Sequence, residues 1–342
     1  MKKKSLNVKK SNPKRLTLFL KQKFIKEIYK KFEKNLVGID RSIVAVSGGP
    51  DSLSLAFLAK YYSTLNSVKF NYILVDHKIR KESSIEAKKV VKLLKKIGVK
   101  CKILIWEGKK PNSNIQKIAR NNRYDLLLKE SKRLKVNTIL LGHHINDLQE
   151  NFFIRMTRGS GLKGLVSLGK DVELSNIKLI RPLINIEKKD LEKLALKVFK
   201  TFIKDPSNVN YDFTRVRIRK ILKDFQKEGL DNKKIELTIN NLKSANEALN
   251  LYTKKNILQN SIYIKNKHSY LIKKEFFKNP EDVLLRSFSS ILQNISGRYY
   301  APRGKKIKKM ILLLTTQRKA QKTTLGGCVI EKVNETVIIY EE

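Results

Sequence analysis

A short apolar run that leads into a polar, glycine-containing turn restricts the fold of this chain more than any other feature. Ile43-Val44-Ala45-Val46 has the β-branched composition of a buried strand, and apolar residues return at helical spacing from Leu53 to Ala59. The turn between them reads Ser47-Gly48-Gly49-Pro50-Asp51-Ser52. Glycines let a backbone turn sharply and approach a ligand closely. The pattern therefore predicts a strand, a tight turn and a helix in direct succession.

The chemistry of this turn favours a phosphate site. Backbone N–H groups at such a turn and at the start of the following helix attract anions. The turn is not a Walker A loop, because no Gly-Lys-Ser/Thr follows at the required spacing. The plainer alternative is a strand-to-helix turn with a serine N-cap. We interpret the segment as a nucleotide site in which Asp51 also holds a metal ion on the phosphate oxygens, and whose members are Ser47, Gly48, Gly49, Pro50, Asp51 and Ser52.

Strands and helices alternate along the first half of the chain. The apolar patterns predict strands at 43–46, 70–75, 99–105 and 137–141, and helices at 53–62, 84–97, 115–134 and 146–156. This rhythm predicts right-handed βαβ units, and therefore an α/β fold with a doubly wound parallel sheet. In such sheets the ligand binds beyond the carboxyl ends of the strands. Polar residues follow three of these strands, at Ser47, Asp76-His77 and Gly142-His143-His144.

The charge of the chain indicates a polyanionic partner. Its 342 residues contain 74 Lys and Arg against 31 Asp and Glu, a formal net charge of +43. Nucleic acid is the first candidate for such a protein. Lys, Ile and Asn are abundant throughout, as an A/T-rich coding sequence would give, so part of the lysine excess is compositional.

Cysteine usage and hydropathy indicate a cytoplasmic protein. Cys101 and Cys328 are far apart and form no C-x-x-C pair, so neither a disulfide framework nor a zinc cluster is indicated. No apolar run reaches transmembrane length, and the basic N-terminus lacks the apolar region of a signal peptide. We therefore expect no membrane partner.

A second cluster of polar residues runs from Gly142 to Glu150. On a helix starting near Asn146, Asp147 and Glu150 are three residues apart and share a face. Paired carboxylates beside a phosphate site can bind magnesium or hold the ammonium of an amino substrate. The alternative is an ordinary acidic first turn, which the helix dipole favours. His143 and His144 next to the pair favour the functional interpretation.

Other polar segments carry weaker signals. Gly159, Gly161 and Gly164 match G-x-G-x-x-G but follow a predicted helix, so we expect a loop and no dinucleotide site. Arg120 and Arg123 lie one helical turn apart, which also suits a solvated face. A turn at Asp205-Pro206-Ser207-Asn208 precedes three arginines that wrap around a helix and that we expect to contact RNA phosphates: Arg215, Arg217 and Arg219. The alternative, which suits the pattern equally well, is that this helix packs back onto the ATP-binding domain.

The turn at Ser47 resembles the PP-loop of the N-type ATP pyrophosphatases, whose pattern is Ser-Gly-Gly-x-Asp-Ser. Over residues 42–220 the chain further resembles the tRNA(Ile)-lysidine synthetase family in the order of its motifs. They are Asp-His-x-x-Arg-x-x-Ser from Asp76, Ala-Arg-x-x-Arg-Tyr from Ala119, His-His-x-x-Asp-x-x-Glu from His143, Arg-Gly-Ser-Gly-Leu-x-Gly from Arg158, Arg-Pro-Leu from Arg181, and Asp-Pro-Ser-Asn from Asp205 before Arg-x-Arg-Ile-Arg. Thr324-Leu325-Gly326-Gly327-Cys328 also looks like the C-terminal domain of that family.

The resemblance implies an ATP-dependent carbon–nitrogen ligase. Such an enzyme adenylates carbon-2 of the wobble cytidine in the isoleucine tRNA with a CAU anticodon, and the amine of free L-lysine then displaces AMP. ATP and Mg²⁺ would bind at Asp51 and the rest of the turn. Asp147 and Glu150 would receive the lysine ammonium, Arg123 would assist the charged intermediate, and His143 would join this substrate site. A homodimer is a further expectation from the family.

The expected organisation has three parts. Residues 1–40 contain a basic amphipathic helix from about Pro13 to Phe32, residues 41–228 form the catalytic domain, and residues 229–342 form a C-terminal tRNA-binding region that is helical and then α+β. Some positions depart from the family pattern: Lys78, Leu148, Asn151 and Val216. The alternatives are a thiolating PP-loop enzyme, which needs more cysteines than this chain has, a small-molecule synthetase, or a non-catalytic RNA-binding protein.

Overall fold

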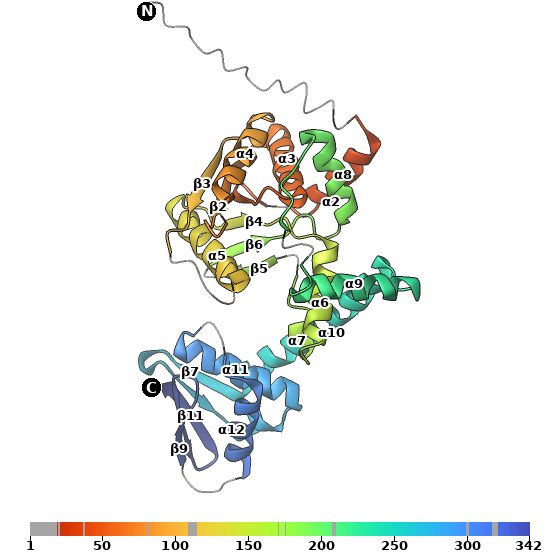
Figure 1. Ribbon diagram of the computed structural model, residues 1–342. Helices are drawn as coiled ribbons and strands as arrows, with labels where there is room; N and C mark the ends of the chain where they lie inside the picture. The colour runs from red at the N-terminus through yellow and green to blue at the C-terminus, as the bar shows by residue number, and fades with distance from the viewer. Residues whose placement is uncertain are drawn as a thin grey trace, which may run out of the picture. The chain divides into compact units, whose positions relative to one another are not determined.

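The structure, a computed structural model, divides into two compact units (Figure 1). It describes residues 19, 21–36, 38–80, 82–108, 115–169, 171–174, 176–206, 210–298, 301–316 and 321–342. Met1–Glu236 form the N-terminal unit and Leu237–Glu342 form the C-terminal unit. The sequence-based boundary near Gly229 lies a few residues earlier, just before helix α10 (Asn232–Asn260), which runs across the boundary between the two units.

The N-terminal unit is built on a six-stranded sheet in the order β3-β2-β1-β4-β6-β5. Its first five members in that order pair in parallel, and β5 pairs antiparallel with β6. The strands are β1 (Arg41–Val46), β2 (Lys69–Asp76), β3 (Cys101–Ile105), β4 (Thr138–Leu140), β5 (Asp171–Leu174) and β6 (Ile177–Ile180). The expected doubly wound α/β fold is therefore confirmed. The sequence pattern did not identify β5 and β6, which are short strands at one edge.

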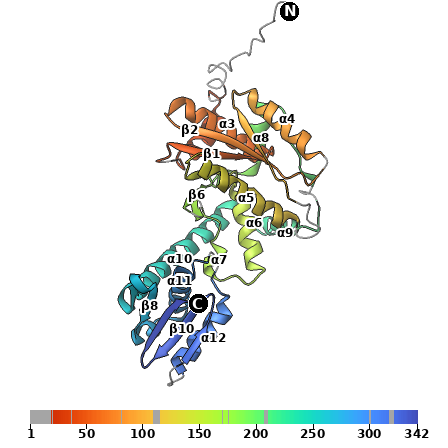
Figure 2. The same cartoon turned by 90° about the vertical axis from the view of Figure 1, so that its left-hand side faces the viewer.

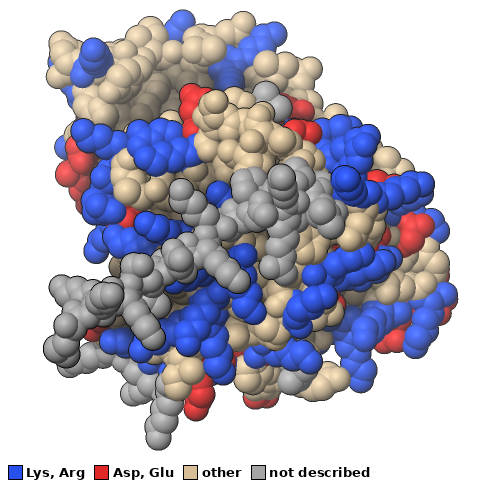
Figure 3. All heavy atoms as spheres, turned by 90° about the horizontal axis from the view of Figure 1, so that it is seen from above, with Lys and Arg blue, Asp and Glu red and all other residues tan. Residues whose placement is uncertain are grey.

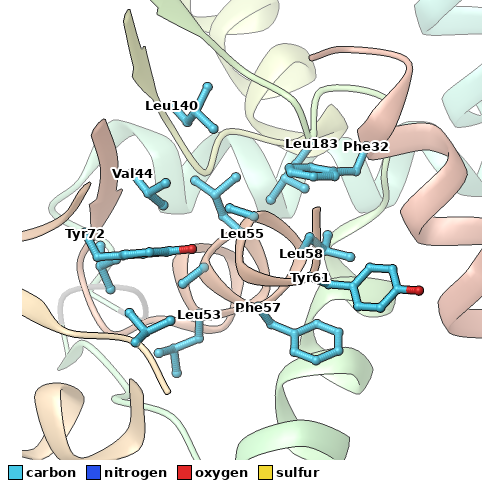
Figure 4. Close-up of a cluster of buried hydrophobic side chains, with 14 of the residues drawn as sticks. Phe32, Val44, Leu53, Leu55, Phe57, Leu58, Tyr61, Tyr72, Leu140 and Leu183 are labelled. Atoms are coloured by element: carbon cyan, nitrogen blue, oxygen red, sulfur yellow. The ribbon is translucent and has the colours of Figure 1, made fainter. Parts of the chain in front are cut away.

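Helices cover both faces of this sheet. On one face lie α3 (Pro50–Leu65), α4 (Ser83–Lys95), α8 (Lys188–Phe199) and α2 (Lys23–Glu33). On the other lies α5 (Ile115–Arg133), whose Leu127 packs with Ile43, Ile139 and Leu179 (Figure 2). Figure 4 shows Leu53 and Leu55 of α3 close to Val44 and Leu140 of the sheet. Residues 52–59 of α3 are buried all round, which explains why this part of the helix lacks a charged face.

Helix α2 explains the amphipathic pattern near the N-terminus. Its Ile25, Ile28, Tyr29 and Phe32 are buried, and the ring of Tyr29 lies edge-on to Tyr61 of α3 at 4.9 Å. Over residues 23–33 the apolar side of the helix therefore packs against the domain that follows it. The first part of the expected helix, from Pro13, lies outside the described residues.

The C-terminal unit contains a five-stranded antiparallel sheet in the order β7-β8-β11-β10-β9. Its strands are β7 (Ser261–Ile264), β8 (Ser269–Ile272), β9 (Gln321–Thr324), β10 (Cys328–Val333) and β11 (Thr336–Glu341). Helices α11 (Glu281–Ser296) and α12 (Gly304–Thr316) pack on its core. The apolar spacing over residues 274–295 predicts a single helix, but Lys274–Lys278 form a 3₁₀ helix and α11 begins after Pro280. Proline suits the start of a helix and interrupts its interior.

Candidate active site

The turn after β1 forms a closed cradle held by Ser52. Its hydroxyl accepts hydrogen bonds from the N–H groups of Ser47 at 3.1 Å and Gly48 at 3.0 Å, and donates to the carbonyl of Gly49. Gly48 has φ +92°, and a Cβ there would lie 2.4 Å from Val90. Beside Gly49 the space is open, and Pro50 begins α3. Glycine is therefore required at Gly48, while open space for a ligand lies at Gly49.

The strand next to β1 brings the second polar cluster against this turn. A Cβ on Gly142, just after β4, would lie 3.3 Å from backbone atoms of Ser52. The segment can thus touch the first turn of α3 only because it has glycine there. Helix α6 (Ile145–Met156) then starts beside α3 with His144 as its N-cap residue. The predicted meeting of polar segments at the carboxyl edge of the sheet takes place here.

His144 joins the two clusters. Its Nε2 lies 3.6 Å from Oδ2 of Asp51 and 3.5 Å from Oδ2 of Asp147, and its side chain is 4% exposed. Burial opposes the charged imidazole, but Asp51, Asp147 and Glu150 outweigh this effect and raise the pKa of His144. Nδ1 of His144 and Oδ1 of Asp51 are buried without a hydrogen-bond partner. A single imidazole thus lies between the carboxylates of both clusters.

Asp147 remains ionised in this environment. Its Oδ2 accepts a hydrogen bond from the N–H of His144 at 3.1 Å. Burial alone would raise its pKa, but the positive charges of His144 and Arg215 and the backbone N–H lower it. The carboxylate is therefore able to receive a cationic group.

Glu150 has a partner within the protein. Its side chain is 3% exposed, and its oxygens accept hydrogen bonds from Nε of Arg219 at 2.5 Å and Nη2 at 3.3 Å. Arg219 belongs to helix α9 (Thr214–Lys227), which packs against α6. A paired buried carboxylate of this kind is much more stable than an isolated one. A lysine ammonium at Glu150 would have to share the carboxylate with Arg219.

His143 directly precedes His144, the N-cap residue of α6, and its imidazole is uncharged. Its Nδ1 accepts a hydrogen bond from Nε of Arg181 at 3.3 Å, and Arg181 also donates to the carbonyl of Gly169. Burial, together with Arg181, Arg120 and Arg215, lowers the pKa of His143 to about 3. The sequence analysis assigned no role to Arg181. Its position in Arg-Pro-Leu directly after β6 was the available signal.

The end of β2 contributes Asp76 and His77. Asp76 accepts hydrogen bonds from Ser83, Ser84 and the N–H of Lys78, which orders the β2–α4 loop. Lys78 has φ +49°, a left-handed backbone conformation that favours glycine. Both ring nitrogens of His77 are buried without a partner, and burial, with the charge of Arg123, lowers its pKa to about 4. Arg123 itself is exposed.

The three arginines of α9 have three different surroundings. The charge of Arg215 acts on His143 and Asp147. Arg217 donates to the carbonyls of Tyr211 and Asp212, and Arg219 binds Glu150. This agrees with the expectation that they do not form one stripe. Ser207 and Asn208 of the preceding turn lie outside the described residues, and Asp205 lies 3.7 Å from Arg80.

Other expectations concern cofactors and the membrane. Gly161 is the N-cap residue of the short helix α7 (Leu162–Leu165), and the segment from Arg158 follows α6 and not a strand, so the glycine pattern has no dinucleotide-binding context. In the described part of the chain no three His, Cys, Asp or Glu side chains form a metal cage. Within the same residues no helix has the length and apolarity needed to cross a membrane.

The fold and the site define a class of protein: a PP-loop enzyme that uses ATP. Residues 20–225 match the PP-loop domain family. The chain is 33% identical over 303 residues to the tRNA(Ile)-lysidine synthase of Wolbachia pipientis, covering 87% of this chain and 70% of that protein. It is 32% identical over 327 residues to the same enzyme of Rickettsia felis, covering 92% and 74%. The chain therefore belongs to the tRNA(Ile)-lysidine synthase family.

A solved structure shares the fold. The chain superposes on the U34-tRNA thiolase NcsA from Methanococcus maripaludis, determined with its 4Fe-4S cluster, with a TM-score of 0.56. The match covers 66% of this chain and 80% of that chain at 22% sequence identity. At this identity the similarity concerns the arrangement of helices and strands alone.

Proposed function

We propose that this chain ligates free L-lysine to carbon-2 of the wobble cytidine in the isoleucine tRNA with a CAU anticodon, giving lysidine, AMP and pyrophosphate. One observation supports this function most directly: Asp51 of the ATP turn and Asp147 of α6 lie 3.6 and 3.5 Å from the same imidazole nitrogen. Activation and amine attack on one carbon require both substrates within a few ångströms of each other. Membership of the lysidine synthase family supplies the identity of the substrates.

In the first half-reaction the oxygen on carbon-2 of cytidine attacks the α-phosphorus of ATP, and pyrophosphate leaves. We assign the phosphates to the open side of the turn, where Ser47, Gly48, Gly49 and Pro50 lead into α3. Ser52 would act by holding the loop closed, since its hydroxyl already bonds within the turn. The result is an adenylated cytidine with AMP as a good leaving group.

Asp51 is the residue we assign to Mg²⁺. Its Oδ1 is buried without a hydrogen-bond partner, and a hard carboxylate oxygen is what Mg²⁺ prefers. The ion would take its other ligands from phosphate oxygens and water. When bound, it would neutralise charge on the phosphates.

In the second half-reaction a lysine amine loses its proton, attacks carbon-2 and displaces AMP. We assign the lysine ammonium to Asp147, whose lowered pKa keeps it ionised, with Glu150 beside it in its pair with Arg219. His143 is uncharged at neutral pH and so does not repel the ammonium. Arg123 would offset negative charge on the phosphate of the departing AMP. The proton acceptor would be a neighbouring carboxylate.

The RNA would bind across the basic surface. Figure 3 shows Lys and Arg side chains spread over one face of the molecule. We assign Arg215 and Arg217 to contacts with the tRNA near the site, with Arg219 contributing through Glu150. We further propose that the C-terminal unit contacts the tRNA, that the reaction takes place in the cytoplasm, and that the protein forms a homodimer, which light scattering can test.

The decisive experiment is mass analysis of the wobble nucleoside after incubation with the tRNA, ATP and lysine. A mass increase corresponding to lysine minus water is expected, together with pyrophosphate release that depends on tRNA. Asp147→Asn should raise the KM for lysine by about a hundredfold and leave the adenylation of tRNA in the absence of lysine largely intact. Absence of lysine in the product would overturn the proposal. Sulfur in the product would instead support the thiolation alternative, which the two cysteines of this chain disfavour.

A further inference from the structure

In the turn before α9, one aromatic ring has no role in the reaction described above. Tyr211 lies in the turn that leads into this helix, and it is 62% exposed. A single exposed tyrosine is normal on a protein surface. Its surroundings are less ordinary, because two cationic side chains of α9 contact this one residue.

Arg217 stabilises the turn that contains Tyr211. The guanidinium donates to the carbonyl oxygens of Tyr211 at 2.8 Å and Asp212 at 2.9 Å. The side chain of Asn210 also accepts a hydrogen bond from the N–H of Asp212 at 2.8 Å. Two carbonyls bound by one guanidinium fix the backbone of the turn. The ring is therefore presented from a fixed position.

Positive charge surrounds the ring. Nζ of Lys220 lies 5.9 Å from the ring centroid, which is within cation–π range. Two residues of the same helix act on the catalytic carboxylates: the charge of Arg215 acts on Asp147, and Arg219 binds Glu150. An exposed ring with lysine and arginine around it suits a nucleotide, since the base can stack while the phosphate meets the cations.

We propose that Tyr211 is a stacking platform for an unpaired anticodon-loop base next to the target cytidine. This inference rests on the proposed function. Carbon-2 of a stacked cytidine cannot reach Asp147 unless the base leaves its stack, and its neighbour then loses a stacking partner. The exposed ring of Tyr211, next to the helix whose Arg215 acts on Asp147, would replace that partner. Arg217 acts as a positioning residue for the ring, and Lys220 contacts the adjoining phosphate.

The test measures the affinity of the full-length protein for an anticodon stem-loop RNA without ATP or lysine. Tyr211→Leu should weaken binding about tenfold, which corresponds to about 1.4 kcal/mol of lost stacking. Tyr211→Phe should bind within about twofold of the wild type, because the ring remains. Lys220→Gln should reduce the salt dependence of log Kd by about one charge. Leu65→Ala, at an apolar residue that is 56% exposed at the end of α3, is the control and should have no effect.

Two results would overturn the platform: wild-type affinity in Tyr211→Leu, or an equal loss in Tyr211→Phe and Tyr211→Leu. The first would show that the ring makes no contact, and the second that the hydroxyl does. Lysidine formation by the wild type at saturating tRNA is measured in parallel. A wild type that makes lysidine while Tyr211→Leu binds normally disproves the platform alone. A wild type that makes none, while Tyr211→Leu binds the RNA weakly, disproves the proposed ligase function alone.

Discussion

The carboxyl edge of the sheet in the N-terminal unit and the core of the C-terminal unit both bury polar side chains. The two regions differ in whether these side chains have hydrogen-bond partners within the protein. At the edge, buried atoms lack hydrogen-bond partners: Oδ1 of Asp51, both ring nitrogens of His77 and Nδ1 of His144. The described part of the same unit has three other such atoms, Oε1 of Gln22, Oη of Tyr72 and Nδ2 of Asn122. In the described residues of the C-terminal unit no buried side-chain nitrogen or oxygen lacks a partner.

The buried polar cluster of the C-terminal unit centres on Asn256. Its amide donates to Ser287 at 3.2 Å and to the carbonyl of Phe276, and its Oδ1 accepts from Asn260 and Asn279 at 2.9 Å each. Ser287 in turn donates to the carbonyl of Val283 at 2.7 Å. Every member of this network is satisfied by the protein itself.

The difference separates polar groups that stabilise the fold from those kept for a ligand. A buried polar group without a partner destabilises the folded state by about 1–3 kcal/mol. Such groups persist where a substrate or ion completes their hydrogen bonds. Substitutions in the two regions should therefore have opposite signatures: loss of activity at the edge, and loss of stability in the C-terminal core.

The largest effect is expected for Asp51→Ala. Turnover should fall by about a hundredfold to a thousandfold, since the carboxylate proposed to hold Mg²⁺ is lost. The thermal midpoint and the affinity for tRNA should stay close to the wild type, because the RNA contacts lie elsewhere. Pyrophosphate release and RNA binding measure the two quantities. Asp125→Ala, at an exposed acid of α5, is the control. Full activity in Asp51→Ala would refute the site assignment.

Asn256→Ala should have the opposite signature. It removes the acceptor of the Asn260 amide, one acceptor of the Asn279 amide and the donor to the Ser287 hydroxyl, so the free energy of unfolding should fall by about 2–3 kcal/mol. Activity below the unfolding transition should be retained. Denaturant unfolding followed by circular dichroism measures the change. Asn240→Ala, at an exposed asparagine of the same helix, should be neutral or slightly stabilising, as alanine favours helices. An equal change in the free energy of unfolding for Asn256→Ala and Asn240→Ala would contradict a stabilising role of the Asn256 network.

His77→Phe tests the edge at a residue outside the two carboxylate clusters. The ring size is nearly kept and two unpartnered nitrogens are removed, so the thermal midpoint should be unchanged or higher. The kcat/KM should fall about tenfold if the nitrogens serve a substrate. A variant with normal activity and raised stability would instead show that His77 is merely an unfavourable core residue.

Glu130→Gln tests whether the presence of hydrogen-bond partners decides if a buried polar side chain stabilises the fold, whichever of the two units contains it. This buried carboxylate of the N-terminal unit binds Arg133 at 2.6 Å and Lys102 at 2.8 Å. Arg133 first, and then Lys102, lower its pKa to about 2, from 4.5 in the unfolded chain. The wild type should therefore be more stable by about 1 kcal/mol near pH 7. The difference should disappear as the pH falls from 4.5 to 2, and activity should be unaffected. An unchanged difference at pH 2 would contradict this.

Much of the fold followed from local patterns. The run 43–46, the turn at Ser47 and the buried helix behind it are fixed by residues within one short segment, and the order of strands and helices gave the parallel sheet. The short strands β5 and β6 escaped detection because four residues carry too little periodicity. The candidate site was found because polar residues directly follow buried strands. The roles assigned to its residues remain predictions for the experiments above.

The sequence by itself determined which residues gather at the carboxyl edge, because strand direction and local turn chemistry decide that. Only the tertiary structure decided which of them have partners. Glu150 is bound by Arg219, 69 residues away, and His143 by Arg181, 38 residues away. Such pairs depend on how whole elements approach each other, and the period of a helix or strand carries no information about that. Ser47 to Ser52 could be interpreted from the sequence, whereas the pairing of Glu150 with Arg219 could not.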